Sequence, residues 1–130
     1  MIDTGNELNR TGAVILDAAI HVHRCLGPGL LEAAYGKALE IVLRKRGQQV
    51  RAEVPITYMF EGVNLGNIFI MDLLVNDAVI VELKSVAALH PIHEAQLLTY
   101  LKLTNKKLGY LINFNVPLLK QGFRRLVHHF

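Results

Sequence analysis

The sequence predicts an α/β domain built on one mixed β-sheet. Two helix-type apolar patterns open the chain, three strand-type patterns follow in close succession, and a further helix precedes a fourth strand. The predicted order is α, α, β, β, β, α, β, with a mixed four-stranded sheet flanked by helices. Because 130 residues is the length of one domain, we expect residues 1–130 to form a single domain.

The first two helices are separated by a Gly-Pro-Gly break. Residues 7–26 carry apolar side chains at helical spacing, and the break at Gly27–Gly29 ends that pattern. Residues 30–46 form the second pattern. It ends in a basic turn followed by Gly47, which is typical of a helix C-terminus.

From residue 49 the apolar period changes from helical to strand-like. Three segments rich in Val, Ile, Phe and Tyr predict strands at residues 50–60, 64–75 and 78–86. Turn-forming pairs separate them, Glu61-Gly62 first and Asn76-Asp77 second, so we expect two successive antiparallel hairpins.

The last part of the chain predicts one helix and one strand. Residues 91–105 form a helical pattern begun by a proline, and residues 108–116 predict the fourth strand. The tail, residues 117–130, is amphipathic and basic, with weak structural signals.

Composition limits the possible function classes. The net charge of +3 is compatible with a nucleic-acid partner, and the single cysteine, Cys25, excludes an internal disulfide and fits a reducing cytoplasm. The polar N-terminus lacks the pattern of a signal peptide. Acidic residues interrupt every long apolar run, so we expect no membrane span.

Charged residues interrupt the most apolar part of the chain. Glu82 and Lys84 lie inside a predicted buried strand, and Asp72 lies inside the strand before it. Buried charge costs free energy unless it is paired or binds an ion. These three residues are therefore candidates for a functional site.

The turn between these strands decides whether the two carboxylates meet. A two-residue turn at Asn76-Asp77 would pair Asp72 with Val81 and send Glu82 to the opposite face. A three-residue loop or a bulge would pair Asp72 with Glu82 directly. We expect the second arrangement, with both carboxylates on one face.

Two adjacent carboxylates repel each other unless a cation lies between them. Oxygen donors at this spacing suit Mg²⁺ or Mn²⁺, with water completing the coordination. Lys84 follows Glu82 by two residues on the same face, where it can orient an attacking water and stabilise phosphate charge. An ion pair of Lys84 with Asp72 or Glu82 is the structural alternative.

These residues resemble the PD-(D/E)XK nuclease superfamily. Asp72 followed by Glu-Leu-Lys at Glu82–Lys84, on consecutive strands between helices, is similar to its signature, and the order of elements is similar to its αβββαβ core preceded by one extra helix. Segments from about residue 10 to the tail, among them HVHRCLGPGLLEAAY and HEAQLLTYLK, also resemble the GxxExxY family, which is grouped with these nucleases. Its naming motif corresponds to Gly29, Glu32 and Tyr35.

The resemblance implies a metal site with defined ligands. Asp72, Glu82 and the Leu83 carbonyl would bind the ion, Glu32 would complete the acidic cluster, and Lys84 would be the catalytic lysine. One departure is Ile70, where a basic residue is expected two positions before the aspartate.

Four further residues are accessory candidates. The resemblance implies a substrate-binding or ordering role for Gln96 and Tyr100, which share one helix face. A polar edge on a core-packed helix is the alternative. Tyr35 is a neighbour of Glu32 on the same helix face, and a solvent-exposed pair is the alternative interpretation of these two residues. His23 either lies near the acidic site or is an ordinary histidine at a helix end.

The sequence thus predicts a Mg²⁺- or Mn²⁺-dependent nuclease that hydrolyses DNA or RNA. The alternative is a non-catalytic nucleic-acid-binding or protein-interaction module with the same fold. Because 130 residues leave little room for target recognition, a partner protein or a homo-oligomer can supply specificity.

Overall fold

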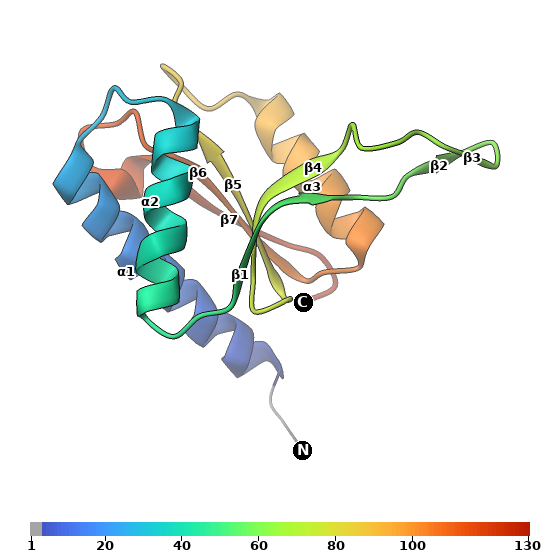
Figure 1. Cartoon of the computed structure of the whole chain (residues 1–130), viewed down its shortest axis with the longest axis horizontal. Helices are drawn as coiled ribbons and strands as arrows, with labels where there is room; N and C mark the ends of the chain where they lie inside the picture. The colour runs from blue at the N-terminus through green and yellow to red at the C-terminus, as the bar shows by residue number, and fades with distance from the viewer. Residues whose placement is uncertain (1–3) are drawn as a thin grey trace.

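A five-stranded sheet forms the centre of the molecule, and the computed structural model describes it over residues 4–130 (Figure 1). The helices are α1 (Thr4–Leu26), α2 (Glu32–Lys45), α3 (Pro91–Thr104) and the 3-10 helix η1 (Leu119–Gly122). The strands are β1 (Val50–Pro55), β2 (Met59–Phe60), β3 (Val63–Asn64), β4 (Ile70–Val75), β5 (Val79–Lys84), β6 (Leu108–Asn113) and β7 (Phe123–Val127). Within the described range, no helix has both the length and the apolar character needed to cross a bilayer.

The sheet is mixed, with strand order β1-β4-β5-β6-β7. Only β5 and β6 run parallel, because α3 connects them as a crossover, and the other neighbouring pairs are antiparallel. The predicted α/β class and the extra N-terminal helix are confirmed.

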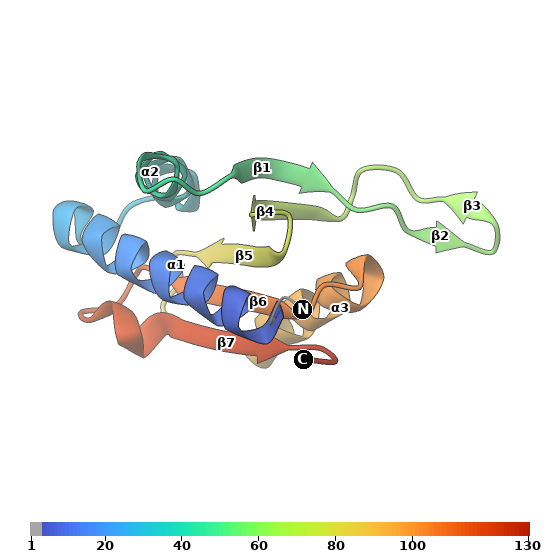
Figure 2. The ribbon, with the colours of Figure 1, turned by 90° about the horizontal axis from the view of Figure 1, so that it is seen from below.

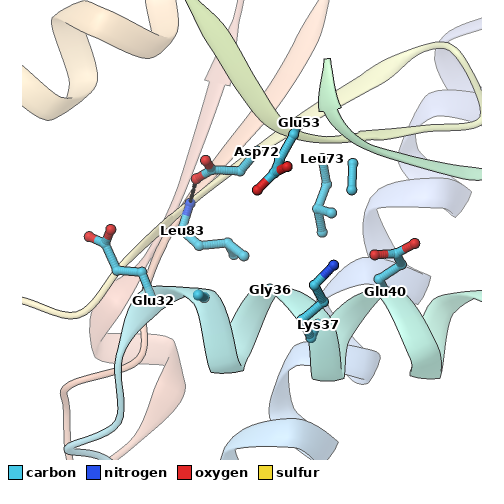
Figure 3. Close-up of a pocket in the computed structure, with 10 residues that line it drawn as sticks. Glu32, Gly36, Lys37, Glu40, Glu53, Asp72, Leu73 and Leu83 are labelled. Carbon is cyan, nitrogen blue, oxygen red and sulfur yellow. Dashed lines mark hydrogen bonds between the residues drawn. The ribbon is translucent and has the colours of Figure 1, made fainter.

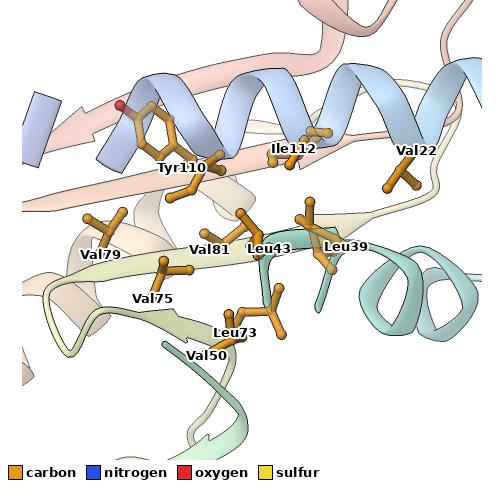
Figure 4. Packing of buried hydrophobic residues seen from close by; sticks show 14 of the residues in the cluster. Val22, Leu39, Leu43, Val50, Leu73, Val75, Val79, Val81, Tyr110 and Ile112 are labelled. Atoms are coloured by element: carbon orange, nitrogen blue, oxygen red, sulfur yellow. The ribbon is translucent and has the colours of Figure 1, made fainter. Parts of the chain in front are cut away.

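Helices cover both faces of the sheet and create two apolar cores (Figure 1). On the face covered by α1 and α2, side chains from both helices pack on alternate residues of the strands (Figure 4), among them Val22, Leu39, Leu43, Val81 and Ile112. On the other face, α3 packs on a second cluster, which includes Ile80, Leu97, Leu101 and Leu111. This alternation is what the strand period predicts.

The prediction of a four-stranded sheet is wrong by one strand. The tail forms η1 and then β7, which pairs antiparallel with β6 from Leu108↔Val127 to Ile112↔Phe123. Arg124 and Arg125 are consecutive and both exposed, so β7 lacks the alternation that marks a half-buried strand. Edge strands often carry such charges, because these discourage pairing with other chains.

The first predicted hairpin divides into two parts. β1 and β4 belong to the central sheet, whereas β2 and β3 form a separate two-stranded arm, residues 56–69, that projects beyond it (Figure 2). No helix covers the arm, so Phe60 and Ile68 are 58% and 68% exposed. The predicted strands 50–60 and 64–75 are therefore each broken, although their turn lies at Glu61-Gly62 as expected.

The second hairpin confirms the predicted register. Leu73 pairs with Val81 and Val75 with Val79, so three residues lie between the paired ends of β4 and β5. Asn76 and Asp77 both have positive φ, 54° and 53°, which those residue types tolerate better than most.

Candidate metal centre

Asp72 and Glu82 meet where β4 and β5 begin to separate. The next step along the ladder beyond Leu73↔Val81 sets Asp72 opposite Glu82. The Asp72 N–H donates to Glu82 Oε1 at 3.2 Å, and the Leu83 N–H donates to Asp72 Oδ2 at 2.8 Å. The two carboxylates therefore come together in one small region between the strands, as the register prediction requires.

Glu82 is costly to ionise in this position. Its side chain is only 5% exposed, and burial, together with the neighbouring charge of Asp72, raises the pKa of Glu82 to about 9. The positive charge of Lys84 lowers the pKa of Glu82, but by less than burial and Asp72 raise it. Near neutral pH and without a cation, the Glu82 carboxyl therefore retains its proton.

The Leu83 backbone faces the same region. The Lys84 carbonyl accepts a hydrogen bond from Phe114 N–H on the β6 side, at 3.0 Å. Because successive carbonyls along a strand point in opposite directions, the Leu83 carbonyl points toward β4, as its N–H does. The Leu83 carbonyl oxygen therefore lies on the same side of β5 as Asp72.

Lys84 is half-buried and close enough to lower the pKa of Glu82. Over residues 4–130, however, no Asp or Glu oxygen lies within 4.0 Å of its ammonium group. The structural alternative, an ion pair of Lys84 with Asp72 or Glu82, is thus not formed.

Asp72 also lines a cavity of about 240 Å³ between α2 and strands β1, β4 and β5 (Figure 3). Glu32, in the first turn of α2, contributes an exposed carboxylate to this cavity. Glu53 of β1, which the sequence analysis does not select, contributes another. Glu82 does not line this cavity, whereas its neighbour Asp72 does.

This donor set fits a hard divalent cation only in a water-rich form. Within residues 4–130, no three His, Cys, Asp or Glu side chains are arranged to hold one ion. The centre instead offers two carboxylates and one carbonyl, and Mg²⁺ is usually bound by one or two carboxylates with several waters. The chemistry of these oxygen donors and the unfavourable carboxylate pair therefore fit a hard divalent cation.

Gln96 and Tyr100 lie on the same side of the sheet as Glu82. Gln96 Nε2 donates to the Tyr100 hydroxyl at 3.2 Å. Burial raises the pKa of Tyr100, and the negative charges of Glu82 and Asp72 add to the shift. Tyr100 is therefore an electrostatic neighbour of the acidic pair, while Gln96 lies at the exposed edge of α3.

Tyr35 points into the core and holds the loop between α1 and α2. Its hydroxyl donates to the Gly27 carbonyl at 2.5 Å and accepts from the Leu30 N–H at 3.1 Å. Its ring stacks on Phe114 with centroids 4.4 Å apart. These contacts favour a role in fixing the start of α2, where Glu32 is located, over direct contact with a substrate.

His23 is also turned inward. It is 8% exposed, and its Nε2 lies 2.8 Å from the Val116 carbonyl oxygen. The Phe114 ring lies 6.4 Å away, centroid to centroid. This environment favours the helix-end interpretation of His23, in which the side chain ties α1 to the segment after β6.

A buried amide, Asn113, supports the segment that follows Lys84. Its Oδ1 accepts from the Val86 N–H at 3.1 Å, and its Nδ2 donates to the Val86 carbonyl at 2.9 Å. Sequence reasoning misses Asn113, although an asparagine at the end of a fully apolar strand is itself a signal. Its contacts fix the direction of the chain directly after the Glu82–Lys84 motif.

The comparison with protein families identifies the superfamily. Residues 9–126 match the family model described as the PD-(D/E)XK nuclease superfamily. The chain therefore belongs to this superfamily. No curated protein and no solved structure shows significant similarity to the chain.

Proposed function

We propose that this protein is a Mg²⁺- or Mn²⁺-dependent nuclease that hydrolyses phosphodiester bonds of DNA or RNA. The observation that carries the proposal is the contact of Asp72 with Glu82 across β4 and β5, with Lys84 beside it. Membership of the superfamily supports the same reaction class.

In this proposal each residue at the centre has one role. Asp72 and Glu82 would hold the cation through their carboxylates, the Leu83 carbonyl would add an oxygen donor, and Glu32 would bind it directly or through water. A cation held there would supply the chemistry of polarising a phosphoryl oxygen and lowering the pKa of the attacking water. Lys84 donates a hydrogen bond that orients this water and stabilises charge developing on the phosphate.

The α3 side supplies accessory groups in the proposal. Tyr100 is adjacent to Glu82 and presents a hydroxyl that Gln96 already contacts. These groups can order Lys84 or contact the phosphate backbone. Tyr35 and His23 act indirectly, since their hydrogen bonds hold the backbone around the Gly27–Gly29 loop and Val116.

Finer features of the proposal rest on the sequence. The motif at Gly29, Glu32 and Tyr35 supports the GxxExxY branch of the superfamily. The net charge of +3 supports a nucleic-acid partner, and one free cysteine supports a reducing compartment such as the cytoplasm. The proposal includes a partner protein or a homo-oligomer as the source of specificity.

Cleavage of labelled single- and double-stranded DNA and RNA with Mg²⁺ or Mn²⁺ tests the proposal. Wild type should cut at least one substrate, and Asp72→Asn and Lys84→Met should reduce cutting by at least about a hundredfold while remaining folded. Asp77→Asn is the matched control, since its side chain is 75% exposed in the β4–β5 turn. Equal cutting by Asp72→Asn and Asp77→Asn would contradict this assignment.

A second candidate function is a non-catalytic nucleic-acid-binding or protein-interaction module. The observation in its favour is Ile70, an apolar residue that is 40% exposed where the superfamily resemblance implies a basic one. Such a module should give no metal-dependent cleavage, and Asp72→Asn should change stability more than any activity. A thermal shift with Mn²⁺ adds a further criterion. Because cation binding stabilises the folded state, Mn²⁺ should raise the unfolding temperature if Asp72 and Glu82 form a metal site, and should leave it unchanged if they do not.

A further inference from the structure

Glu53 lies on β1 directly opposite Asp72. The antiparallel ladder pairs Ala52 with Leu73 and Val54 with Met71, which leaves Glu53 facing Asp72. The strand that carries Glu53 is therefore the neighbour of β4 on the side away from Glu82. Asp72 thus has an acidic residue on both adjacent strands.

The backbone at Glu53 turns its side chain into the cavity. Its φ is 54°, in the left-handed region that residues other than glycine rarely adopt. Val50 packs in the core on the α1 and α2 face, whereas Val54 packs on the α3 face, although an even separation normally keeps two strand residues on one face. The irregularity at Glu53 breaks this alternation, and Ala52 and Glu53 both line the cavity.

The charges in this cavity are only partly compensated. Glu40 is paired with Arg44 at 3.0 Å, but over the described residues 4–130 neither Glu32 nor Glu53 has an ion-pair partner within 4.0 Å. Lys37 lines the same cavity without a carboxylate oxygen within that distance. Figure 3 shows Glu53 extending toward Asp72, with Glu32 beyond Asp72.

We propose that Glu53 is a further, water-mediated ligand of the divalent cation, on the cavity side of Asp72. This inference rests on the proposed function, because the cation is the one that Asp72 and Glu82 would hold. Glu53 lines the cavity together with Asp72, whereas Glu82 does not, so Glu53 approaches Asp72 from the β1 side. Direct and water-mediated donors would then come from three adjacent strands and α2.

Direct Mn²⁺ binding, measured by calorimetry and by the electron paramagnetic resonance signal of free Mn²⁺, tests the inference without depending on catalysis. Glu53→Gln should weaken Mn²⁺ binding by about tenfold, as is typical when a group that supports a metal ligand is removed. Glu40→Gln is the matched control, because Glu40 lines the same cavity but is neutralised by Arg44. It should bind within about twofold of wild type.

A glycine variant separates metal binding from folding. Glu53→Gly removes the carboxylate and also removes the steric cost of a positive φ. The metal-free variant should therefore unfold at the same temperature as wild type or higher, while its Mn²⁺-induced stabilisation should be smaller. If Glu53→Gln binds Mn²⁺ as tightly as Glu40→Gln does, Glu53 is not a ligand.

The outcome also distinguishes this inference from the proposed function. Loss of binding in Asp72→Asn with unchanged binding in Glu53→Gln would overturn the role of Glu53 and leave the centre at Asp72 and Glu82 standing. Absence of Mn²⁺ binding in wild type would overturn both. Weakened binding in both variants, with Glu40→Gln unaffected, would support both.

Discussion

The Asp72 N–H donates to Glu82 Oε1, so the backbone of one proposed metal ligand holds the side chain of the other. This hydrogen bond spans β4 and β5 at the point where their ladder ends. It fixes the Glu82 carboxyl in a buried position next to a second carboxylate. The arrangement is unfavourable for two negative charges and favourable once a cation joins them.

The first prediction concerns the stability of the metal-free protein. The pKa of Glu82 is about 9 in the folded state, well above its ordinary value of 4.5. Between these two pH values the folded chain holds a proton that the unfolded chain releases. This contribution to stability is therefore complete below about pH 4.5 and is lost as the pH rises toward 9, by at most about 1.4 kcal/mol per pH unit.

Urea unfolding in the presence of a chelator, at pH 5.5, 7.0 and 8.5, measures this effect. Glu82→Gln retains a neutral side chain at every pH, so its stability should exceed that of wild type by an increasing margin as the pH rises. Parallel pH profiles for the two proteins would contradict a raised pKa at Glu82.

The second prediction concerns the proton that Glu82 must release to bind a cation. Since the carboxyl is protonated near pH 7 in the metal-free protein, Mn²⁺ binding should release up to one proton and tighten as the pH increases, by at most about tenfold per unit. Calorimetry in two buffers of different ionisation enthalpy counts the released protons. An affinity that is independent of pH between 6 and 8 would argue against Glu82 as a ligand.

The third prediction concerns Tyr35 and the loop it holds. Tyr35→Phe keeps the stacking on Phe114 but removes a hydroxyl that bonds both the Gly27 carbonyl and the Leu30 N–H. The free energy of unfolding should fall by about 1–3 kcal/mol, because backbone groups in a partly buried loop lose their partner. Tyr58→Phe, on the projecting arm, is the control and should change it by less than about 0.5 kcal/mol. Equal effects of the two substitutions would contradict the role of the Tyr35 hydroxyl.

The sequence predicts the central features of the site because they follow from strand geometry. A period of two residues and a three-residue loop are sufficient to set Asp72 opposite Glu82, and the structure has this register. The order of elements is predicted for a similar reason, since long periodic segments define the helices and the buried strands.

Sequence patterns do not predict three features of the structure, which involve Glu53, Tyr35 and β7. The alternation of strand residues assumes a regular backbone. It therefore cannot predict that Glu53 has a left-handed backbone conformation and turns its side chain into the cavity. Helical spacing identifies Tyr35 as a neighbour of Glu32, but only the packed structure reveals that the tyrosine is fully buried while the glutamate is exposed. β7 carries two adjacent arginines, and its pairing depends on the free edge of β6 rather than on its own pattern.

The last prediction concerns Gly122, which lies against the end of β6. A Cβ atom at Gly122 would overlap the carbonyl oxygen of Asn113, and because the contact is with backbone, no side-chain rotation relieves it. Asn113 in turn holds Val86 just after Lys84. Gly122→Ala should therefore lower the free energy of unfolding by about 1–3 kcal/mol, as overpacking typically does.

Urea unfolding compares Gly122→Ala with Lys120→Ala, an exposed position in the same 3-10 helix, which should change stability by less than about 0.5 kcal/mol. Hydrogen exchange adds a local criterion. The Val86 N–H donates to Asn113 Oδ1, so its protection should fall in Gly122→Ala if displacement of Asn113 reaches the segment after Lys84. Unchanged stability in Gly122→Ala would mean that β7 and η1 can move away from β6 at little cost in free energy. The contact between Gly122 and Asn113 would then not couple the C-terminal segment to the proposed metal centre.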